Sequence, residues 1–519
     1  MLIKNGTIID GTGKERFRGD VRIEGDKIKE VGNLKPRRRE KTIKADNQFV
    51  VPGFVDIINR SDIHTSIFRR SGLRSLIKQG VTTILGGSCG ASLAPLAGKE
   101  AIRSIQKWQD ISRININWAS TEEFLEEVGR HKIDLNFATL TGHATLRRGL
   151  VGDYFGDLKE EDVKKMEYLL ARSIDEGSFG LSMGLEYSHE RTASAKELER
   201  LLTIVKGKEG LYTAHLRDEG LGLVSSVEEI VGAAKRIGVS SHISHFKALG
   251  RKAWGEFPKA LDVISNAKSD GVPIDFDIYP YKRTASVLYL LLPDWASEGG
   301  KAKVLQRLRD DKTRQKIRDE LKEQAGELGE TVIGVGDTGD IFAGKTLEEI
   351  AKNQDTSVVD ALLNVILASE DRVMGFLPIS ERNMKLAMKS SLGFISSDGA
   401  GYRIKERDRE GLVHPRSFGT FPRFLGRYVR KMNIISWEEA IQKITTLPAQ
   451  KIGLEKRGRI EKGYFADITV FDPARIRDRA TFKNPFQYSR GVNYVIVNGG
   501  SALVRGKFTK KQWGRVLRK

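Results

Sequence analysis

One cysteine and two distant histidines are the residues of this chain whose types are best suited to hold a metal ion. Cys89 is the only cysteine among 519 residues, so it can serve as a small core residue, a nucleophile or a metal ligand, but not in an internal disulfide. His215 and His245 lie far downstream, and all three residues follow apolar, strand-like runs. A thiolate and two imidazoles brought together at strand ends would form a zinc site that leaves room for water.

The sequence around Cys89 changes character within a few residues. It begins as a β-branched apolar run, Val81 to Leu85, and then breaks into glycines on both sides of the cysteine. This pattern is typical of a buried parallel strand that opens into a loop approached closely by other backbone. Near His245, a second histidine, His242, competes as a ligand, and we expect it to share a strand face with His245 and to support the site from behind.

The middle of the chain alternates strand-like runs with amphipathic helical segments such as 162–176, which predicts an α/β fold. The eight runs start at residues 54, 82, 135, 180, 211, 240, 274 and 393. Eight such units favour a (β/α)8 TIM-like barrel, in which the chemistry lies at the C-terminal ends of the strands. Cys89, His215, His245 and Asp398 all come after one of these runs, as this fold requires.

The two ends of the chain share another pattern, short strands separated by turns. Residues 1–53 and 451–519 each contain too few strands for a stable sandwich alone. We therefore expect one small β-sandwich domain built from both termini, with a barrel of residues 54–450 inserted between its halves. A charged helical tract within about 288–375 predicts an α-rich insertion near the barrel mouth, either a lid or a solvated helix pair.

The composition, with 39% hydrophobic and 30% charged residues, indicates a globular protein. No apolar run is long enough to cross a membrane and no signal peptide is visible, so with a lone cysteine we expect a cytoplasmic protein. The net charge of +19 is unusually basic. Because the basic residues are scattered among 68 acidic ones without an aromatic-interleaved motif, we do not expect a nucleic-acid partner. The oligomeric state stays open.

Ten sequence motifs, in order along nearly the whole chain, resemble those of the D-aminoacylase (N-acyl-D-amino-acid deacylase) family within the amidohydrolase superfamily. They occupy residues 51–56, 87–96, 142–147, 180–187, 215–220, 243–247, 277–281, 397–399, 414–423 and 466–473. The resemblance implies a barrel with a small β domain, the fold also expected from the strand pattern. It further implies a hydrolase that acts on a small N-acyl amino acid.

By this resemblance, Cys89, His215 and His245 match the tight zinc ligands. One thiolate and two neutral imidazoles leave the fourth position of the ion open for water or a substrate carbonyl. Asp398, in Ser-Ser-Asp-Gly, matches the catalytic acid and base, since amide hydrolysis needs a group that takes a proton from water and delivers one to the leaving nitrogen. A turn-capping role is the structural alternative for Asp398.

The resemblance also assigns substrate-binding residues, namely Lys247, Tyr187, Tyr281 and Ser286. A lysine close to a zinc-binding histidine can meet a substrate carboxylate as a point charge. The hydroxyl groups of the other three can fix acyl or carboxylate oxygens. Tyr279 is the alternative match to Tyr281 in the alignment of this motif, and in isolation a tyrosine in Tyr-Pro-Tyr more often packs in a core.

The chain departs from the family at its first barrel strand. Amidohydrolases normally follow Pro-Gly-Phe-x-Asp with a His-x-His pair that binds a second metal, but here Ile58 and Arg60 occupy the two histidine positions. His64 lies four residues too late unless the loop shifts. We therefore expect one zinc, with the Arg60 guanidinium supplying fixed positive charge near the substrate or Asp398.

Three functions remain open from the sequence. The first, which we favour, is a one-zinc hydrolase of N-acyl-D-amino acids. The second is a cyclic-amide hydrolase of the dihydroorotase and hydantoinase type, although such sites usually use a modified lysine where this chain has Cys89. The third is a degenerate barrel that binds ligands without turnover, because the His-x-His pair is absent. The preferred side chain, the acyl group and the strictness for D over L substrates cannot be derived from the sequence.

Overall fold

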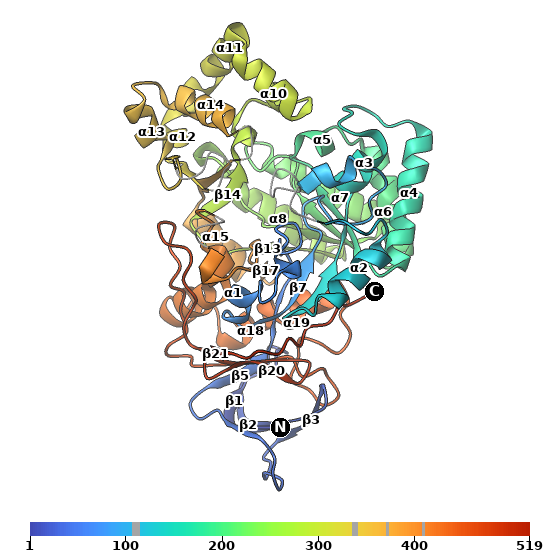
Figure 1. The fold of residues 1–519 in the computed structure, drawn as a ribbon, viewed down its shortest axis with the longest axis vertical. Coiled ribbons are helices and arrows are strands. Elements are labelled where there is room, and N and C mark those ends of the chain that lie inside the picture. The colour runs from blue at the N-terminus through green and yellow to red at the C-terminus, as the bar shows by residue number, and fades with distance from the viewer. Residues whose placement is uncertain (106–114, 335–340, 370–372, 407–410) are drawn as a thin grey trace.

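The computed structural model describes residues 1–105, 115–334, 341–369, 373–406 and 411–519. Figure 1 shows three parts stacked along the long axis: a sheet that holds the N-terminus at the bottom, parallel strands wrapped by helices in the middle, and a helical insertion at the top. The chain has an α/β fold, as predicted. Among the residues that are described, no helix is long and apolar enough to span a membrane.

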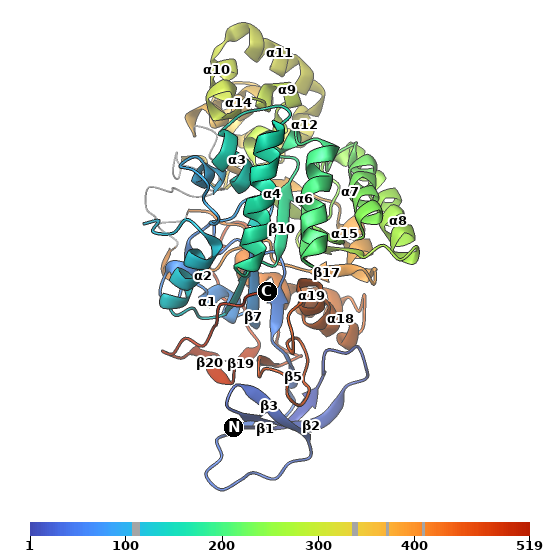
Figure 2. The same cartoon turned by 90° about the vertical axis from the view of Figure 1, so that its right-hand side faces the viewer.

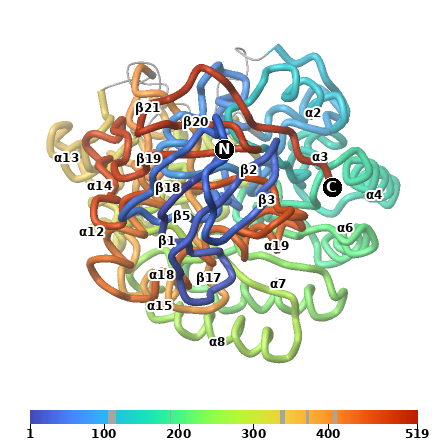
Figure 3. The backbone as a smooth tube through the Cα atoms, turned by 90° about the horizontal axis from the view of Figure 1, so that it is seen from below, coloured from blue at the N-terminus to red at the C-terminus, as the bar shows by residue number. Residues whose placement is uncertain are grey.

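Strands from both ends of the chain form one nine-stranded sheet. The N-terminal strands are β1 (Leu2–Ile8), β2 (Phe17–Glu24), β3 (Lys27–Gly32), β4 (Thr42–Lys44) and β5 (Phe49–Pro52). The C-terminal strands are β18 (Ile468–Phe471), β19 (Val492–Val497), β20 (Gly500–Val504) and β21 (Lys507–Phe508). The two sets join where β5 pairs antiparallel with β18, and Figure 3 shows the N-terminal strands in blue beside the C-terminal strands in red. The two-layer sandwich stays a prediction.

Eight parallel strands form the centre of the molecule, and they coincide with the eight runs expected from the sequence. One sheet contains β6 (Phe54–Asp56), β7 (Val81–Gly86) and β8 (Asn136–Thr139). A second contains β10 (Gly180–Gly184), β11 (Leu211–His215), β12 (Ser240–Ile243), β13 (Ile274–Ile278) and β17 (Gly393–Ile395), with the short β9 (Thr141–Gly142) at its edge. A parallel bridge between Asn59 and Gly399 connects the ends of β6 and β17. The first and last strands therefore lie next to each other.

Amphipathic helices cover the outside of these strands, and α4, α6, α7 and α8 lie side by side in Figure 2. They include α2 (Thr121–Arg130), α3 (His143–Val151), α4 (Glu160–Asp175), α6 (Ala195–Gly207), α7 (Leu223–Ile237), α8 (Glu256–Ser269) and α15 (Glu381–Lys389). In α7, Val227, Ile230 and Ala234 recur at helical spacing and are buried. Gly238, at φ 72°, ends this helix in the left-handed conformation. The helix sequence thus sets which face packs on the strands.

The insertion builds a small antiparallel sheet and a helical layer. Its strands are β14 (Arg283–Val287), β15 (Val332–Ile333) and β16 (Met374–Pro378). Its helices are α9 (Asp294–Ser297), α10 (Gly300–Arg309), α11 (Asp311–Leu321), α12 (Ala325–Gly329), α13 (Leu347–Asn353) and α14 (Val358–Ala368). The apolar core of the insertion, with Leu308, Ile317 and Leu362, also takes in Cys89 and Tyr187. The insertion therefore packs against the residues predicted to hold zinc.

Candidate metal centre

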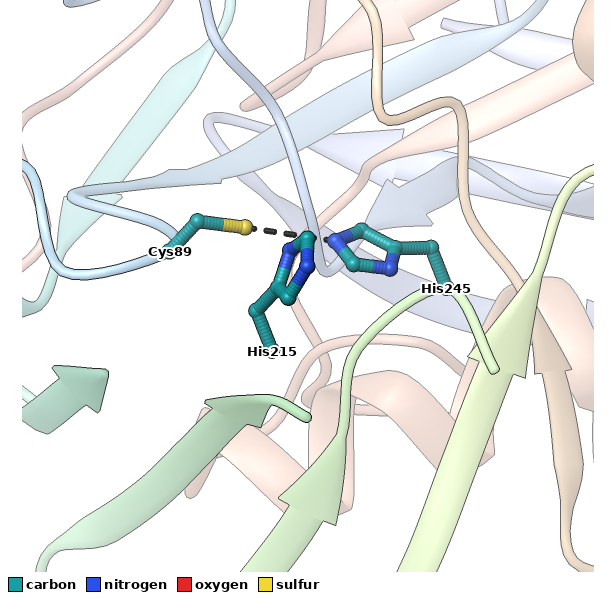
Figure 4. Close-up of side chains that lie close together, drawn as sticks. All are labelled: Cys89, His215 and His245. Atoms are coloured by element: carbon teal, nitrogen blue, oxygen red, sulfur yellow. Dashed lines mark hydrogen bonds between the residues drawn. The ribbon is translucent and has the colours of Figure 1, made fainter. Parts of the chain in front are cut away.

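The structure brings Cys89, His215 and His245 together from three different strand ends. Cys89 follows β7, His215 is the last residue of β11, and His245 follows β12. One potential ligand atom from each lies within 4.8 Å of the other two, and all three residues are buried. Figure 4 shows their side chains pointing toward one another. This is the convergence on which the prediction of a zinc site depended.

The nitrogens of the two imidazoles are arranged for metal binding. Nε2 of His215 lies 2.6 Å from Oε2 of Glu186, whereas its buried Nδ1 has no hydrogen-bond partner in the described structure. Nε2 of His245 faces the Cys89 sulfur at 3.3 Å, and its Nδ1 lies 3.4 Å from Oε1 of Glu219. Metal-bound histidines usually hold their second nitrogen against a carboxylate in this way. The donor set and its supports therefore fit zinc.

Burial sets the protonation of the three ligands. Burial lowers the pKa of His215 to about 4 and that of His245 well below its usual value. Both imidazoles are thus neutral at pH 7, the form in which they donate a lone pair. Burial raises the pKa of the Cys89 thiol to about 12 despite the nearby Arg60. A metal cation bound directly to the sulfur, such as zinc, would convert this thiol to a thiolate at neutral pH.

Three of the predicted site residues have left-handed backbone conformations. Cys89, His245 and Asp398 have φ angles of 53°, 39° and 44°. A non-glycine residue in this region costs on the order of 1 kcal/mol and persists only where the surrounding structure enforces it. Because each lies just after its strand ends, the turn redirects its side chain toward the common centre.

Two glycines and an aspartate fix the loop that carries Cys89. Gly87, at φ 70°, lies so close to Leu140 that a Cβ atom would be 2.1 Å from the carbonyl oxygen of that residue. The Gly87 amide donates to Oδ2 of Asp62 over 2.6 Å. At Gly90 a Cβ atom would lie 2.1 Å from a carboxylate oxygen of Glu190. The glycines thus permit the close approach expected from the sequence.

Asp398 lies between two arginines. Nε of Arg60 is 2.5 Å from Oδ1 of Asp398, and Nη1 of Arg416 is 2.8 Å from Oδ2. Burial by itself raises the pKa of Asp398, but Arg416 and then Arg60 outweigh it and hold the pKa well below its ordinary value. Nη2 of Arg60 also lies 3.3 Å from the Cys89 sulfur. Arg60 therefore lies between the predicted acid/base and a predicted zinc ligand.

The ends of β6 and β17 are pinned so that Arg60 and Asp398 meet. The Asp398 amide donates to the Ile58 carbonyl and the Arg60 amide to the Gly399 carbonyl. Below them, the buried Asp56 carboxylate accepts a hydrogen bond from the Ser397 amide at 2.7 Å. This reciprocal pairing fixes two residues that are 338 positions apart in the sequence.

Lys247 is in the site, but Glu219 already neutralises it. Its Nζ lies 2.6 Å from Oε1 of Glu219 and 3.2 Å from Nδ1 of His245. A substrate carboxylate that contacts Lys247, as predicted, would have to share its ammonium group with Glu219. Tyr187 is buried, and its ring centroid lies 5.1 Å from that of His215.

Of the two candidate tyrosines in Tyr-Pro-Tyr, Tyr279 lies closer to the charged site. The Arg416 guanidinium lies over the Tyr279 ring, 4.8 Å from its centroid. The Tyr281 hydroxyl instead donates to the backbone carbonyl of Pro415. Ser286 is half-buried on β14, where it pairs with Gly375 of the insertion, and its hydroxyl makes no recorded contact with the ligands. Tyr279 is therefore the tyrosine nearer to Arg416 and Asp398, and contact of either tyrosine with substrate stays a prediction.

His242 and His64, the two other histidines that the sequence offered as possible ligands, lie outside the ligand cluster. His242 places Nδ1 2.5 Å from Asp275 and Nε2 2.9 Å from Asp277, so carboxylates occupy both its nitrogens. Asp277 also accepts the His245 amide. His242 thus supports the His245 turn from behind. His64 contacts the Tyr402 hydroxyl instead of replacing the missing His-x-His pair.

Sequence reasoning gave no role to Arg416, Glu186 or Glu219. Each lies within a motif that carried the family resemblance, at 414–423, 180–187 and 215–220. Glu186 directly precedes Tyr187 and Glu219 lies in the same motif as His215, and this proximity in sequence is a usable signal for carboxylates that support metal ligands. Arg416 comes from a helix that starts beyond the last strand, and no spacing rule indicated its approach to Asp398.

Comparison with known proteins agrees with this geometry. A family model described as "Amidohydrolase family" matches residues 413–501. N-acyl-D-glutamate deacylase of Alcaligenes xylosoxydans xylosoxydans is 28% identical, over 100% of this chain and 96% of its own length. The structure of N-acyl-D-glutamate deacylase from Bordetella bronchiseptica, complexed with zinc and a phosphonate mimic of the tetrahedral intermediate, is 27% identical with a TM-score of 0.84, covering 100% and 99% of the chains.

A D-aminoacylase structure gives the same match, at 29% identity and a TM-score of 0.84 over 100% of this chain and 99% of that one. The description of that structure refers to a binuclear metal centre with activation by one metal and attenuation by the second. These similarities extend over full chains, so they concern the complete fold.

Proposed function

We propose that this chain, which belongs to the D-aminoacylase family of the amidohydrolase superfamily, is a zinc-dependent hydrolase that cleaves the amide bond of N-acyl-D-amino acids. The observation that carries the proposal is the buried convergence of Cys89, His215 and His245 beside Asp398. Full-length relatives named as deacylases of this substrate class support it. A degenerate, non-catalytic barrel has no physical need for all four groups.

In this mechanism Cys89, His215 and His245 would hold a zinc ion, which would supply Lewis acidity to polarise the substrate carbonyl and ease deprotonation of water. Asp398 accepts the proton of the attacking water and then delivers it to the leaving amine nitrogen. Its lowered pKa keeps it in the accepting form and makes its protonated form a strong donor. The buried Tyr187 hydroxyl is our candidate for hydrogen bonding to the oxygen on which negative charge develops.

The finer architecture is part of the same proposal. The eight parallel strands would close into a (β/α)8 barrel through the contact of β6 with β17, and the terminal sheet would fold over as a small sandwich domain. The insertion would act as a lid, because its core includes Cys89 and Tyr187. A cytoplasmic site of action fits a chain whose one cysteine is buried and free.

The direct test is a panel of N-acetyl-D-amino acids with matching L-isomers, assayed on protein of measured zinc content. We expect about one zinc per chain and turnover of D substrates. Cyclic ureides and imides test the dihydroorotase and hydantoinase alternative, which Cys89 disfavours. Hydrolysis of cyclic substrates alone, or zinc-loaded protein with no turnover of either class, would overturn the proposal.

A second prediction concerns the number of metals. Because the Arg60 guanidinium lies between Asp398 and Cys89, excess zinc is expected neither to add a second tightly bound ion nor to attenuate activity. The double change Ile58→His with Arg60→His should raise the zinc content toward two per chain, measured by elemental analysis after gel filtration. Arg60→Lys keeps the charge and serves as the control, with one zinc. Two zinc ions in the wild type would contradict this role for Arg60.

A third prediction concerns pH. The charge of Arg416 is one of the two arginine charges that lower the pKa of Asp398, so Arg416→Gln should raise that pKa and move the acid limb of kcat/KM to higher pH. The sign follows because the accepting carboxylate form would be lost earlier as the pH falls. Arg423→Gln, in the same helix but paired with Asp478, should leave the limb in place. An unmoved limb in Arg416→Gln would show that another group controls it.

A further inference from the structure

A cationic cavity lies away from the metal centre, and the proposed hydrolysis does not use it. It has a volume of about 800 Å³ and lies where the end of helix η9 (Phe424–Lys431) meets the segment before β19 and the turn between β20 and β21. None of its lining residues belongs to the metal centre. Its charged lining residues are Lys78, Arg430, Lys431, Arg475, Arg477, Arg490 and Asp472.

These lining residues give the cavity six cations against one carboxylate, a net of five positive charges (six minus one). The one carboxylate, Asp472, lies 3.8 Å from the guanidinium of Arg475, whose side chain is 83% exposed. Oδ1 of Asp472 also accepts hydrogen bonds from the backbone amides of Ala474 and Arg475. It therefore neutralises little of the charge. Five charges in one cavity are a substantial part of the +19 of the chain.

Arg477 and Arg490 are held directly opposite each other. They form an antiparallel bridge in which each backbone amide donates to the carbonyl of the other at 3.0 Å. Side chains of such a pair extend from the same face, and like charges in this arrangement are destabilising. Neither guanidinium has an ion-pair partner within the described part of the chain. The fold thus holds two arginines together with nothing between them to compensate the repulsion.

The neighbouring cations add to this repulsion. Arg430 donates to the Pro473 carbonyl at 2.8 Å, and burial together with Arg477 lowers its pKa. Lys78 donates to the Gly506 carbonyl at 2.7 Å. The hydrogen-bond partners of both cations are neutral carbonyls, and of the two only Arg430 is compensated by a nearby carboxylate among the residues that the structure describes, that of Asp472. An anion in the cavity would relieve the repulsion among all of these groups at once.

We propose that this cavity is a binding site for a small anion that carries two or more phosphate groups. Paired guanidinium forks match phosphate oxygens in a bidentate manner, and the surrounding lysines add point charge. The volume exceeds that of a single orthophosphate and the net charge calls for a multivalent ligand. This anion site does not depend on the proposed hydrolysis, so a failure of the hydrolase proposal would leave it unaffected.

Tripolyphosphate binding to the zinc-loaded, full-length protein, measured by calorimetry at about 0.15 M salt, tests the site. We expect binding that is weaker for orthophosphate and at least about tenfold weaker in the double variant Arg477→Ala with Arg490→Ala. The matched control is Arg479→Ala with Lys483→Ala, which removes two exposed charges nearby that do not line the cavity. The control should bind as the wild type does.

Because both substituted side chains are exposed and the bridge uses backbone atoms, the double variant should fold, which circular dichroism and zinc content verify. Arg477→Lys with Arg490→Lys keeps charge without the fork and should show an intermediate loss. Absence of tripolyphosphate binding would overturn the proposal. Undiminished binding in the double variant would also overturn it, because the ligand would then bind at the zinc or elsewhere. Binding of a single-stranded oligonucleotide but not of tripolyphosphate would overturn the small-ligand assignment.

Discussion

Replacement of Asp398 by asparagine is expected to abolish turnover while the protein keeps its zinc. The amide cannot accept the proton of the attacking water, and loss of general acid–base catalysis typically costs about 10²–10⁴ in rate. That corresponds to about 3–5 kcal/mol of barrier. Asp398 is not one of the three clustered ligand residues, so elemental analysis should still find one zinc per chain. The measurement is kcat/KM on an N-acetyl-D-amino acid.

Stability has to be separated from catalysis in this experiment, since Asp398→Asn also removes the carboxylate partner of two buried arginines. Asp467→Asn is the matched control, because Asp467 is equally buried and paired with the buried Arg457, but lies in the terminal sheet. Both variants should lose thermal stability, and only Asp398→Asn should lose activity. Comparable turnover in Asp398→Asn would remove the acid/base assignment.

The strand pattern predicted much of this site for a physical reason. Parallel strands present their C-terminal ends at one face, so residues that follow apolar runs must gather there, however far apart they are in the chain. Cys89, His215, His245 and Asp398 were identifiable in this way. The neighbourhood of Arg60 and Asp398 followed from the same rule, because the first and last strands pair.

Contacts that depend on tertiary placement were not predictable. Arg416 reaches Asp398 from helix α17 (Arg416–Arg423), and nothing local in the sequence states where that helix lies. The choice between His242 and His245 depended on β12 ending at Ile243, after which the chain turns His245 inward at φ 39°. The two histidines are three positions apart, so a continuous strand would direct them to opposite faces, and the expectation that they share a face was wrong.

The terminal strands show a related limit. The short strands separated by turns that the sequence predicts at the N-terminus include the hairpin of β2 and β3, and the incomplete halves implied that the two ends associate. The pairing of β5 with β18, in which Val50 lies opposite Val470, joins residues with similar β-branched apolar character at both ends. Such interchangeable residues do not encode which strand pairs with which, or whether the strands form one layer or two.

Loss of zinc together with activity is expected when Cys89 is replaced by alanine. The thiolate is the only anionic donor of the cluster, and without it two neutral imidazoles would face a doubly charged ion in a buried site. Changes around a metal site in supporting residues alone typically cost about 10–100-fold in affinity, so removal of a direct ligand should cost more. Elemental analysis after gel filtration should therefore find almost no zinc, and kcat/KM should fall to background.

Ser88→Ala provides the matched control for this change. Ser88 is the buried neighbour of Cys89, and its hydroxyl has no hydrogen-bond partner in the described structure, so its removal alters the same loop without removing a ligand. This variant should keep one zinc and its activity. Zinc content distinguishes this variant from Asp398→Asn, because only Cys89→Ala should lose the zinc. A Cys89→Ala protein that still held one zinc would show that the ion binds elsewhere, with Glu186, His215 and Glu219 as the alternative cluster.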